Sequence, residues 1–186
     1  KAELESRLND LARQIDGGAQ EKGIRAGTLN VPGIVGLGKA CEIAAKELEN
    51  EAIRITLLRD RLYHGIISGV KGVRLNGDPV KRIPGNLNIS IEGIDADSLM
   101  ISMKEVAVST GSACSSEAVE PSHVLSAIGL DKNLMRSTIR FGIGRFNTEE
   151  EIEYVINKIS EKVNYLRSIA PSNNGKKQKK GEYAEV

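Results

Sequence analysis

The chain has 186 residues, and its 26 basic and 25 acidic side chains nearly cancel. This length suits one domain with a real hydrophobic core, and the balanced charge excludes a global field that would attract nucleic acid or an anionic membrane. Tryptophan is absent and aromatic residues make up only 3% of the sequence, which argues against recognition of nucleic-acid bases by stacking. We therefore expect any partner to be recognised at a local site.

The two cysteines, Cys41 and Cys114, are too few and too far apart for a disulfide framework or a zinc-ligand array. The sequence shows no recognisable secretory signal, and no apolar run approaches the roughly 18 residues that a membrane span needs. These features predict a cytoplasmic protein with reduced thiols and without membrane contact.

The first part of the chain predicts mostly helix. Residues 1–13 space their leucines as a short amphipathic helix does, and the glycine-rich stretch 16–28 excludes regular structure. Asn30 is a predicted cap for a long helix that ends at about Ser68. Cys41 falls in the apolar stripe of this helix, where we interpret it as a small structural hydrophobe.

The rest of the chain alternates short strands and helices. Strands are predicted at 72–75, 86–91, 106–108 and 138–144, and helices at 95–103, at 121–128 and from Thr148, where Glu151 completes a capping-box signature. This order predicts an α/β domain of the layered α+β kind over residues 14–170, with a small sheet packed against helices. Residues 171–186 predict a disordered tail. The lysines of this tail could contact nucleic acid, but a solvated tail is the favoured interpretation.

The strand at 138–144 predicts one apolar and one open face, because side chains alternate along a strand. Ile139, Phe141 and Ile143 share the face that we expect in the core. On the other face, Arg140 stands beside glycine positions that leave room for a small ligand, and its planar fork matches a carboxylate. From this stretch alone, pairing of Arg140 with a neighbouring acidic side chain on a solvated sheet face is the favoured interpretation.

The glycine-rich stretch ends at Gly27 and Thr28, just before the long helix. Free backbone N–H groups and a helix N-terminus favour a phosphate at such a position, and the hydroxyl of Thr28 adds a donor. The spacing matches neither the P-loop nor the dinucleotide fingerprint, so a plain flexible connection is the favoured interpretation from these residues alone.

Cys114 stands among small residues in the segment STGSACSS. Such residues bury little surface, so we predict a mobile loop with an accessible thiol, whose reactivity depends on how much thiolate its surroundings permit. A nucleophilic Cys–His pair with His64 or His123 is an open alternative that the pattern supports only thinly.

Several motifs, in their order and spacing, resemble those of the cysteine desulfurases. They are GGAQEKGIRAGT, NGD, NLNIS, VSTGSACSS, EPSHVL, IGL and STIRFGIGRFNTEEEI, and the similarity runs from about Gln14 to Leu166. The resemblance implies the small C-terminal domain of the aminotransferase-like fold, in a pyridoxal-phosphate-dependent enzyme that takes sulfur from L-cysteine and gives L-alanine. The long cysteine loop implies the branch that supplies iron–sulfur cluster scaffolds, and the family implies a homodimer.

The same matching implies roles for three residues. Cys114 resembles the nucleophile that holds sulfur as a persulfide, on a loop that moves between the cofactor pocket and an acceptor protein. Arg140 resembles the arginine that binds the substrate α-carboxylate, and Thr28 resembles the threonine that reaches across the dimer to the phosphate of pyridoxal 5′-phosphate. Position 19 departs from the family, which has a third glycine where this chain has Ala19.

The family binds its cofactor through a lysine in a Ser-x-His-Lys context. In this chain Gly65 follows His64 and Val124 follows His123, so that motif is missing, and family members are considerably longer. We therefore interpret the sequence as the C-terminal part of a desulfurase that is inactive alone. A non-enzymatic sulfur carrier or scaffold-docking module that uses Cys114 is the alternative.

Overall fold

The computed structural model describes residues 16–110 and 122–170. The chain divides into two compact units, one that ends at Leu48 and one that begins at Glu49. The boundary falls within helix α2 (Val31–Gly69). The predicted N-terminal helix, Cys114 and the predicted C-terminal tail lie outside the described residues.

The first unit holds the glycine-rich stretch and the start of α2. A 3-10 turn, η1 (Glu21–Gly23), lies within the stretch, so the prediction that no regular structure forms there is wrong over these residues. The predicted cap of the long helix is confirmed, because Asn30 Oδ1 accepts a hydrogen bond from the N–H of Gly33 at 3.1 Å.

The interpretation of Cys41 as a buried hydrophobe is wrong. Cys41 is exposed, and Ile34, Val35 and Leu37 on the same helix have relative exposures of 52, 65 and 68%. No described segment of the first unit covers this apolar part of α2. Helical periodicity identified the stripe, but it carries no information about what packs on it.

The second unit is built on a four-stranded antiparallel sheet with the strand order β1-β2-β4-β3. Its strands are β1 (Val73–Leu75), β2 (Asn86–Ile91), β3 (Ser109–Thr110) and β4 (Thr138–Gly142). The predicted bounds of β2 are confirmed, whereas β3 begins only after the strand predicted at 106–108. Val106 and Val108 pack against the core from an irregular segment instead, because an apolar side chain can fill a core without joining a ladder.

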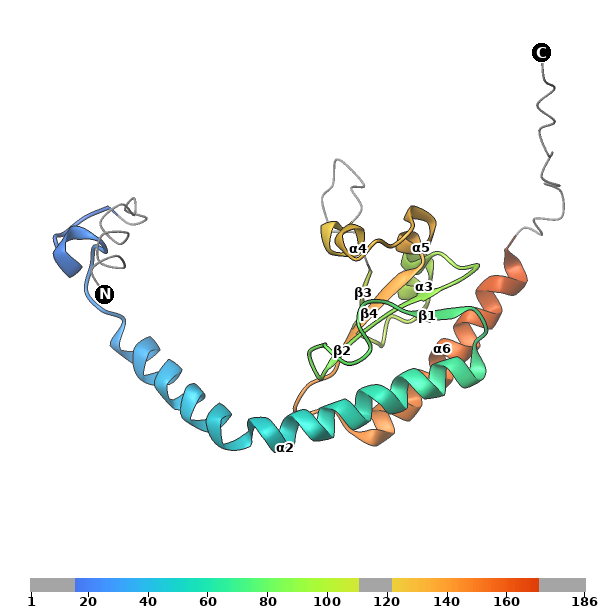
Figure 1. The fold of residues 1–186 in the computed structure, drawn as a ribbon, viewed down its shortest axis with the longest axis horizontal. Helices are drawn as coiled ribbons and strands as arrows, with labels where there is room; N and C mark the ends of the chain where they lie inside the picture. Colours follow the sequence, from blue (N-terminus) through green and yellow to red (C-terminus); the bar gives the residue numbers. More distant parts are fainter. Residues whose placement is uncertain (1–15, 111–121, 171–186) are drawn as a thin grey trace, which may run out of the picture. The chain divides into compact units, whose positions relative to one another are not determined.

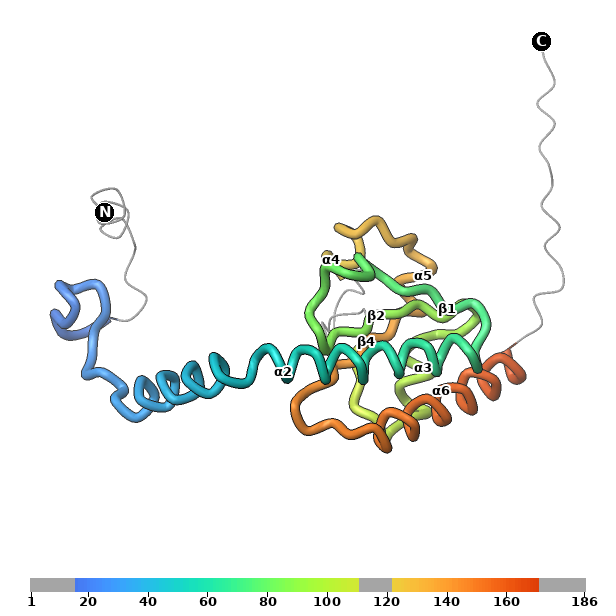
Figure 2. Tube along the Cα trace, turned by 60° about the horizontal axis from the view of Figure 1, so that its bottom comes forward, coloured from blue at the N-terminus to red at the C-terminus, as the bar shows by residue number. Residues whose placement is uncertain are grey.

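Four helices complete the second unit, together with the C-terminal part of α2. They are α3 (Ala96–Ser102), α4 (His123–Ala127), α5 (Lys132–Arg136) and α6 (Glu149–Ile169). Figure 1 and Figure 2 show α6 and this part of α2 along one side of the sheet, with α4 and α5 on the other. The layers confirm the predicted α/β class.

Within residues 16–110 and 122–170, none of the helices is both long and apolar enough to pass through a membrane.

Local capping explains where two of these helices begin. The capping box predicted for α6 is present, since the N–H of Thr148 donates to Glu151 Oε2 at 3.1 Å and the N–H of Glu151 donates to Thr148 Oγ1 at 3.3 Å. The short α5 was not predicted. Asp131 caps it by accepting from the N–H of Asn133 at 2.8 Å, a signal that the sequence does contain.

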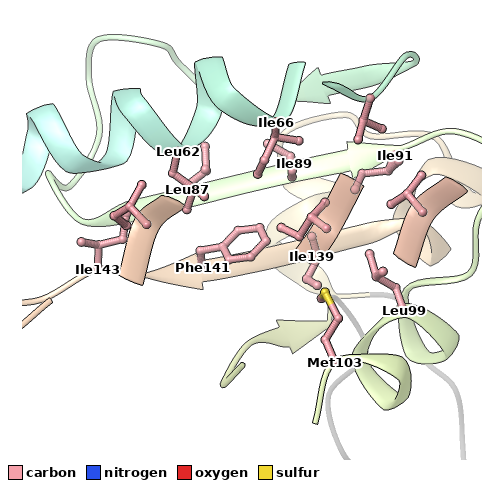
Figure 3. Packing of buried hydrophobic residues seen from close by; sticks show 14 of the residues in the cluster. Leu62, Ile66, Leu87, Ile89, Ile91, Leu99, Met103, Ile139, Phe141 and Ile143 are labelled. Atoms are coloured by element: carbon pink, nitrogen blue, oxygen red, sulfur yellow. The ribbon is translucent and has the colours of Figure 1, made fainter. Parts of the chain in front are cut away.

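The hydrophobic core lies on one face of the sheet, as Figure 3 shows. Leu87, Ile89 and Ile91 of β2 face it, together with Ile139 and Phe141 of β4, and none of these five is more than 4% exposed. The helices contribute Leu62 and Ile66 from α2, Leu99 from α3, and Ile152, Ile159 and Val163 from α6. Each such side chain stabilises the fold by about 1.5–3 kcal/mol when it is fully buried. The burial confirms the predicted apolar face of the 138–144 strand.

A close backbone approach joins the end of β4 to the start of β2 at Gly85. Its carbonyl oxygen accepts a hydrogen bond from the N–H of Ile143 at 2.8 Å. A Cβ atom built at Gly85 would lie 1.9 Å from the carbonyl oxygen of Ile143. Only glycine fits here, so the register of the two central strands depends on the missing side chain.

The substitution Gly85→Ala should therefore lower the free energy of unfolding by about 3 kcal/mol or more, because the methyl group forces the two backbones apart. Gly142→Ala is the matched control. A Cβ atom at Gly142 meets no described heavy atom within 4 Å, so this variant should stay within about 0.5 kcal/mol of the parent. Urea unfolding measures both, and equal midpoints for the two variants would contradict the steric argument.

The segment that leads to β3 is tied to α6 through Glu105. The carboxylate of Glu105 pairs with Lys158 and accepts a hydrogen bond from the hydroxyl of Tyr154 at 3.2 Å. The hydrogen bond from Lys158 is the main reason why the pKa of Glu105 falls to about 2, and the same contact raises the pKa of Lys158. This pairing fixes the chain shortly before β3 begins.

Lys158→Met should raise the pKa of Glu105 from about 2 towards its ordinary value of 4.5. A depressed folded-state pKa adds stability above pH 4.5 that disappears as the pH falls towards 2, so the variant should lose this acid-side dependence. Lys162→Met is the control, because Lys162 pairs with Glu161 instead. An NMR titration of Glu105 that is identical in the parent and in Lys158→Met would refute the assignment.

Candidate functional site

Arg140 lies in β4 between two neighbours on the same face of the sheet. The antiparallel register places Asn88 of β2 opposite it on one side and Ser109 of β3 on the other. Arg140 is exposed, and its Nη2 donates to the hydroxyl of Ser109 at 3.4 Å. Among the described residues it has no acidic partner, so the alternative of a simple surface ion pair finds no support in that part of the chain.

Two glycine positions leave space on the face that carries Arg140. Gly142 belongs to β4, and Gly144 follows the strand. A Cβ atom built at either position would meet no described heavy atom within 4 Å. The open space that the alternation of side chains predicted beside the guanidinium is therefore present, and a small ligand can lie there against the backbone.

The opposite end of this face carries a buried row of polar side chains. Asn76, Ser90 and Thr138 are 5, 0 and 0% exposed. Nδ2 of Asn76 donates to Oδ1 of Asn88 at 2.8 Å and to Oγ of Ser90 at 2.9 Å. The hydroxyls of Ser90 and Thr138 lie 2.8 Å apart, and Oγ1 of Thr138 donates to the carbonyl oxygen of Leu134 at 2.7 Å.

The sequence analysis missed this polar row. Its only signal was the outward spacing of asparagine and serine in NLNIS, which is also the pattern of an ordinary half-exposed strand. Throughout residues 16–110 and 122–170, every buried side-chain nitrogen or oxygen has a hydrogen-bond partner. The row is therefore a satisfied network that holds one end of the face rigid while the Arg140 end stays open.

Thr28 lies in the first unit, between the glycine-rich stretch and α2, and it is exposed. Two side chains brace the loop before it. The N–H of Gly27 donates to Oε1 of Gln20 at 3.0 Å, and Nη2 of Arg25 donates to the carbonyl oxygen of Gly27 at 2.9 Å. The N–H of Gly27, one donor of the phosphate cradle considered above, is thus already satisfied by a side chain.

The hydroxyl of Thr28 has no hydrogen-bond partner among the described residues. The guanidinium of Arg25 bonds to the carbonyl oxygen of Gly27, the residue that precedes Thr28. Hydroxyl and guanidinium donors are groups that bind phosphate in proteins, so the donor set fits a phosphate ligand. Thr28 belongs to the first unit and Arg140 to the second.

Cys114 and its predicted mobile loop lie outside the described residues. β3 ends at Thr110, so the strand that contacts Arg140 runs directly into the segment that carries Cys114. His64 is exposed on α2 beside Tyr63, with ring centroids 5.5 Å apart. His123 is exposed at the start of α4. A Cys–His pair with either histidine stays a prediction.

Comparison with known proteins places most of the chain in one protein family. The aminotransferase class-V family matches residues 13–155. The cysteine desulfurase IscS of Anaeromyxobacter sp. (strain K) is 50% identical over 161 residues, which are 87% of this chain and 40% of that protein. The cysteine desulfurase of Homo sapiens is 48% identical over 155 residues, which are 83% of this chain and 34% of that protein.

Solved structures agree with this placement. A NifS-like protein superposes with a TM-score of 0.70 at 35% identity, over 83% of this chain and 39% of that protein. A NifS-like protein from Rickettsia africae also gives a TM-score of 0.70, at 29% identity over 82% of this chain and 40% of that protein. The chain thus spans about 40% of the length of the relatives it matches. It belongs to the aminotransferase class-V family, with the aminotransferase-like fold, and is similar to the cysteine desulfurases of that family.

Proposed function

We propose that this chain is part of a pyridoxal-phosphate-dependent cysteine desulfurase. Arg140 binds the α-carboxylate of L-cysteine, and Cys114 takes the substrate sulfur as a persulfide, with L-alanine as the other product. An iron–sulfur cluster scaffold or another acceptor protein then receives the sulfur. The relatives named cysteine desulfurase support this reaction, and the structural observation that carries it is the guanidinium of Arg140 on an open sheet face.

The surroundings of Arg140 support a role in carboxylate binding. Two other arginines of the second unit are paired with acids, since Arg61 pairs with Glu149 and Glu153, and Arg145 pairs with Glu51. Within residues 16–110 and 122–170, the side-chain partner of Arg140 is instead the neutral hydroxyl of Ser109. A guanidinium with unused N–H groups beside open space binds a carboxylate through two parallel hydrogen bonds, which orients the ligand as well as holding it.

The path of the chain supports a role for Cys114 at the same site. Cys114 follows Thr110 by four residues, and four extended residues span at most about 14 Å. Its thiol is therefore tethered to the strand on which Ser109 meets Arg140. In the proposed step the Cys114 thiolate attacks the substrate sulfur, a sulfur–sulfur bond forms, and the carbon–sulfur bond breaks with its electron pair left on the carbon side. Protonation of that carbon gives L-alanine.

The hydroxyl of Thr28 and the guanidinium of Arg25 would hold a phosphate oxygen of the cofactor, across the interface of a homodimer. When bound, pyridoxal phosphate supplies the electron sink that the cleavage of the carbon–sulfur bond requires. The proposal assigns the cofactor-binding lysine to another part of the enzyme, so these 186 residues alone do not turn over L-cysteine. The proposed location is the cytoplasm, where thiols stay reduced.

Arg140→Ala, in the complete enzyme that carries this segment, should weaken L-cysteine binding by about 2–3 kcal/mol, because it removes a charge-assisted pair of hydrogen bonds. Arg74→Ala is the matched control, since Arg74 is also exposed and lies opposite Ser90, on the same sheet face. The loss of substrate binding is measured as the rise in the KM for L-cysteine in each variant. A rise for Arg74→Ala that equals the rise for Arg140→Ala would show that surface charge alone accounts for the effect.

Cys114→Ser should leave substrate binding nearly unchanged and abolish sulfur transfer, because the hydroxyl cannot hold a persulfide. Cys41→Ser should transfer sulfur like the parent, even though the thiol of Cys41 is exposed. Intact-mass analysis after reaction with L-cysteine, followed by peptide mapping, locates the added sulfur. A persulfide found on Cys41, or transfer that persists in Cys114→Ser, would overturn the assignment.

A further inference from the structure

The neighbour of Arg140 on β2 is an asparagine whose orientation the hydrogen-bond network determines. Asn88 and Arg140 are directly opposite in the antiparallel register, so their Cβ atoms lie about 4.5–5.5 Å apart on the same face. Asn88 is half-buried, whereas Arg140 is exposed. The two side chains thus form one row, with Ser109 of β3 on the far side of Arg140.

The direction of the donors in this network follows from its far end. The carbonyl oxygen of Leu134 can only accept, so the hydroxyl of Thr138 donates to it. The hydroxyl of Ser90 must then donate to Thr138. Oδ1 of Asn76 also lies within hydrogen-bond distance of Ser90 Oγ, at 3.3 Å, but the contact to Thr138 is shorter at 2.8 Å and takes the proton of Ser90. The oxygen of Ser90 then accepts from Nδ2 of Asn76 at 2.9 Å.

The same reasoning extends to Asn88. The second hydrogen of Asn76 Nδ2 goes to Oδ1 of Asn88 at 2.8 Å, so the oxygen of the Asn88 amide faces the network. The Nδ2 group of Asn88 is the other end of the amide, and it has no hydrogen-bond partner among the described residues. Two N–H donors of Asn88 therefore have no partner among the described residues, at the position directly opposite Arg140 in the register of β2 and β4.

The network itself needs only the oxygen of Asn88. An aspartate at position 88 would accept from Asn76 equally well, but its second oxygen would pair with Arg140 and occupy the guanidinium. An asparagine gives the network its acceptor, leaves the charge of Arg140 free, and adds a neutral donor beside it. An anion over the row would use both the charge of Arg140 and this neutral donor.

We propose that Asn88 is a second carboxylate-binding residue, whose Nδ2–H donates to the carboxylate that Arg140 holds. A carboxylate has about four lone-pair sites, so it can accept from the Arg140 fork and from Asn88 together. The inference rests on the proposed function in one respect, since that function supplies the α-carboxylate of an amino acid as the ligand. It makes Asn88 a determinant of specificity for ligands that carry this carboxylate.

The test compares two ligands that differ by the carboxylate alone. L-alanine contains it, and ethylamine keeps the amine and the methyl group without it. In the complete cofactor-loaded enzyme, Asn88→Asp should weaken L-alanine binding by about tenfold to a hundredfold, because the new oxygen competes for Arg140. Asn88→Ala should weaken it less, since it removes only one donor. Ethylamine binding, measured by calorimetry as for L-alanine, should not change in either variant.

Asn157→Asp is the matched control, because Asn157 is exposed on α6, which packs on the core side of the sheet away from Arg140, and it should preserve L-alanine binding. Equal losses for both ligands, or a loss in Asn157→Asp as large as in Asn88→Asp, would show a general structural effect and refute the role of Asn88. Full L-alanine affinity in Asn88→Asp would also refute it, while turnover of L-cysteine by that variant would leave the proposed function standing. A parent enzyme that binds L-alanine through Asn88 but does not desulfurate L-cysteine would support this inference and refute the proposed function.

Discussion

The alternation of side chains along β4 is the constraint on which the rest of the site depends. Ile139 and Phe141 are 0 and 4% exposed, and their burial anchors the strand on the core. Because the side-chain period is two, this burial turns Arg140 to the opposite face. A register slip by one residue would place the guanidinium in an apolar core, at a cost of several kcal/mol. Core packing therefore orients the guanidinium of Arg140.

The neighbours of β4 give that charge its surroundings. β2 brings Asn88 to one side and β3 brings Ser109 to the other, and neither residue carries a charge. Arg61 and Arg145 show what happens to arginines with acidic neighbours, since both are paired with carboxylates. A neutral row keeps the electrostatic attraction of Arg140 available for a ligand. The proposed carboxylate site thus depends on the absence of acidic side chains at the two positions opposite Arg140 in β2 and β3.

The segment that reaches Cys114 is fixed near its start by two contacts from different elements. Glu105 pairs with Lys158 of α6, and the short strand β3 pairs with β4 at Arg140 and Ile139. A proposed nucleophile that must reach both a substrate and an acceptor needs a loop that can move around the nucleophile and is anchored where the loop begins. The described residues supply the attachment next to the proposed carboxylate site.

Local rules were enough for the parts of this protein that depend on neighbours in sequence. The caps at Asn30 and Thr148 and the two faces of β4 follow from residues a few positions apart, so the sequence by itself determined them. The sequence did not determine whether the apolar stripe around Cys41 is buried, because the stripe has the same periodicity whether or not another segment packs on it. The row from Thr138 to Asn88 was also decided by tertiary structure. Its members come from separate strands and loops, and only the sheet register makes Asn88 the neighbour of Arg140.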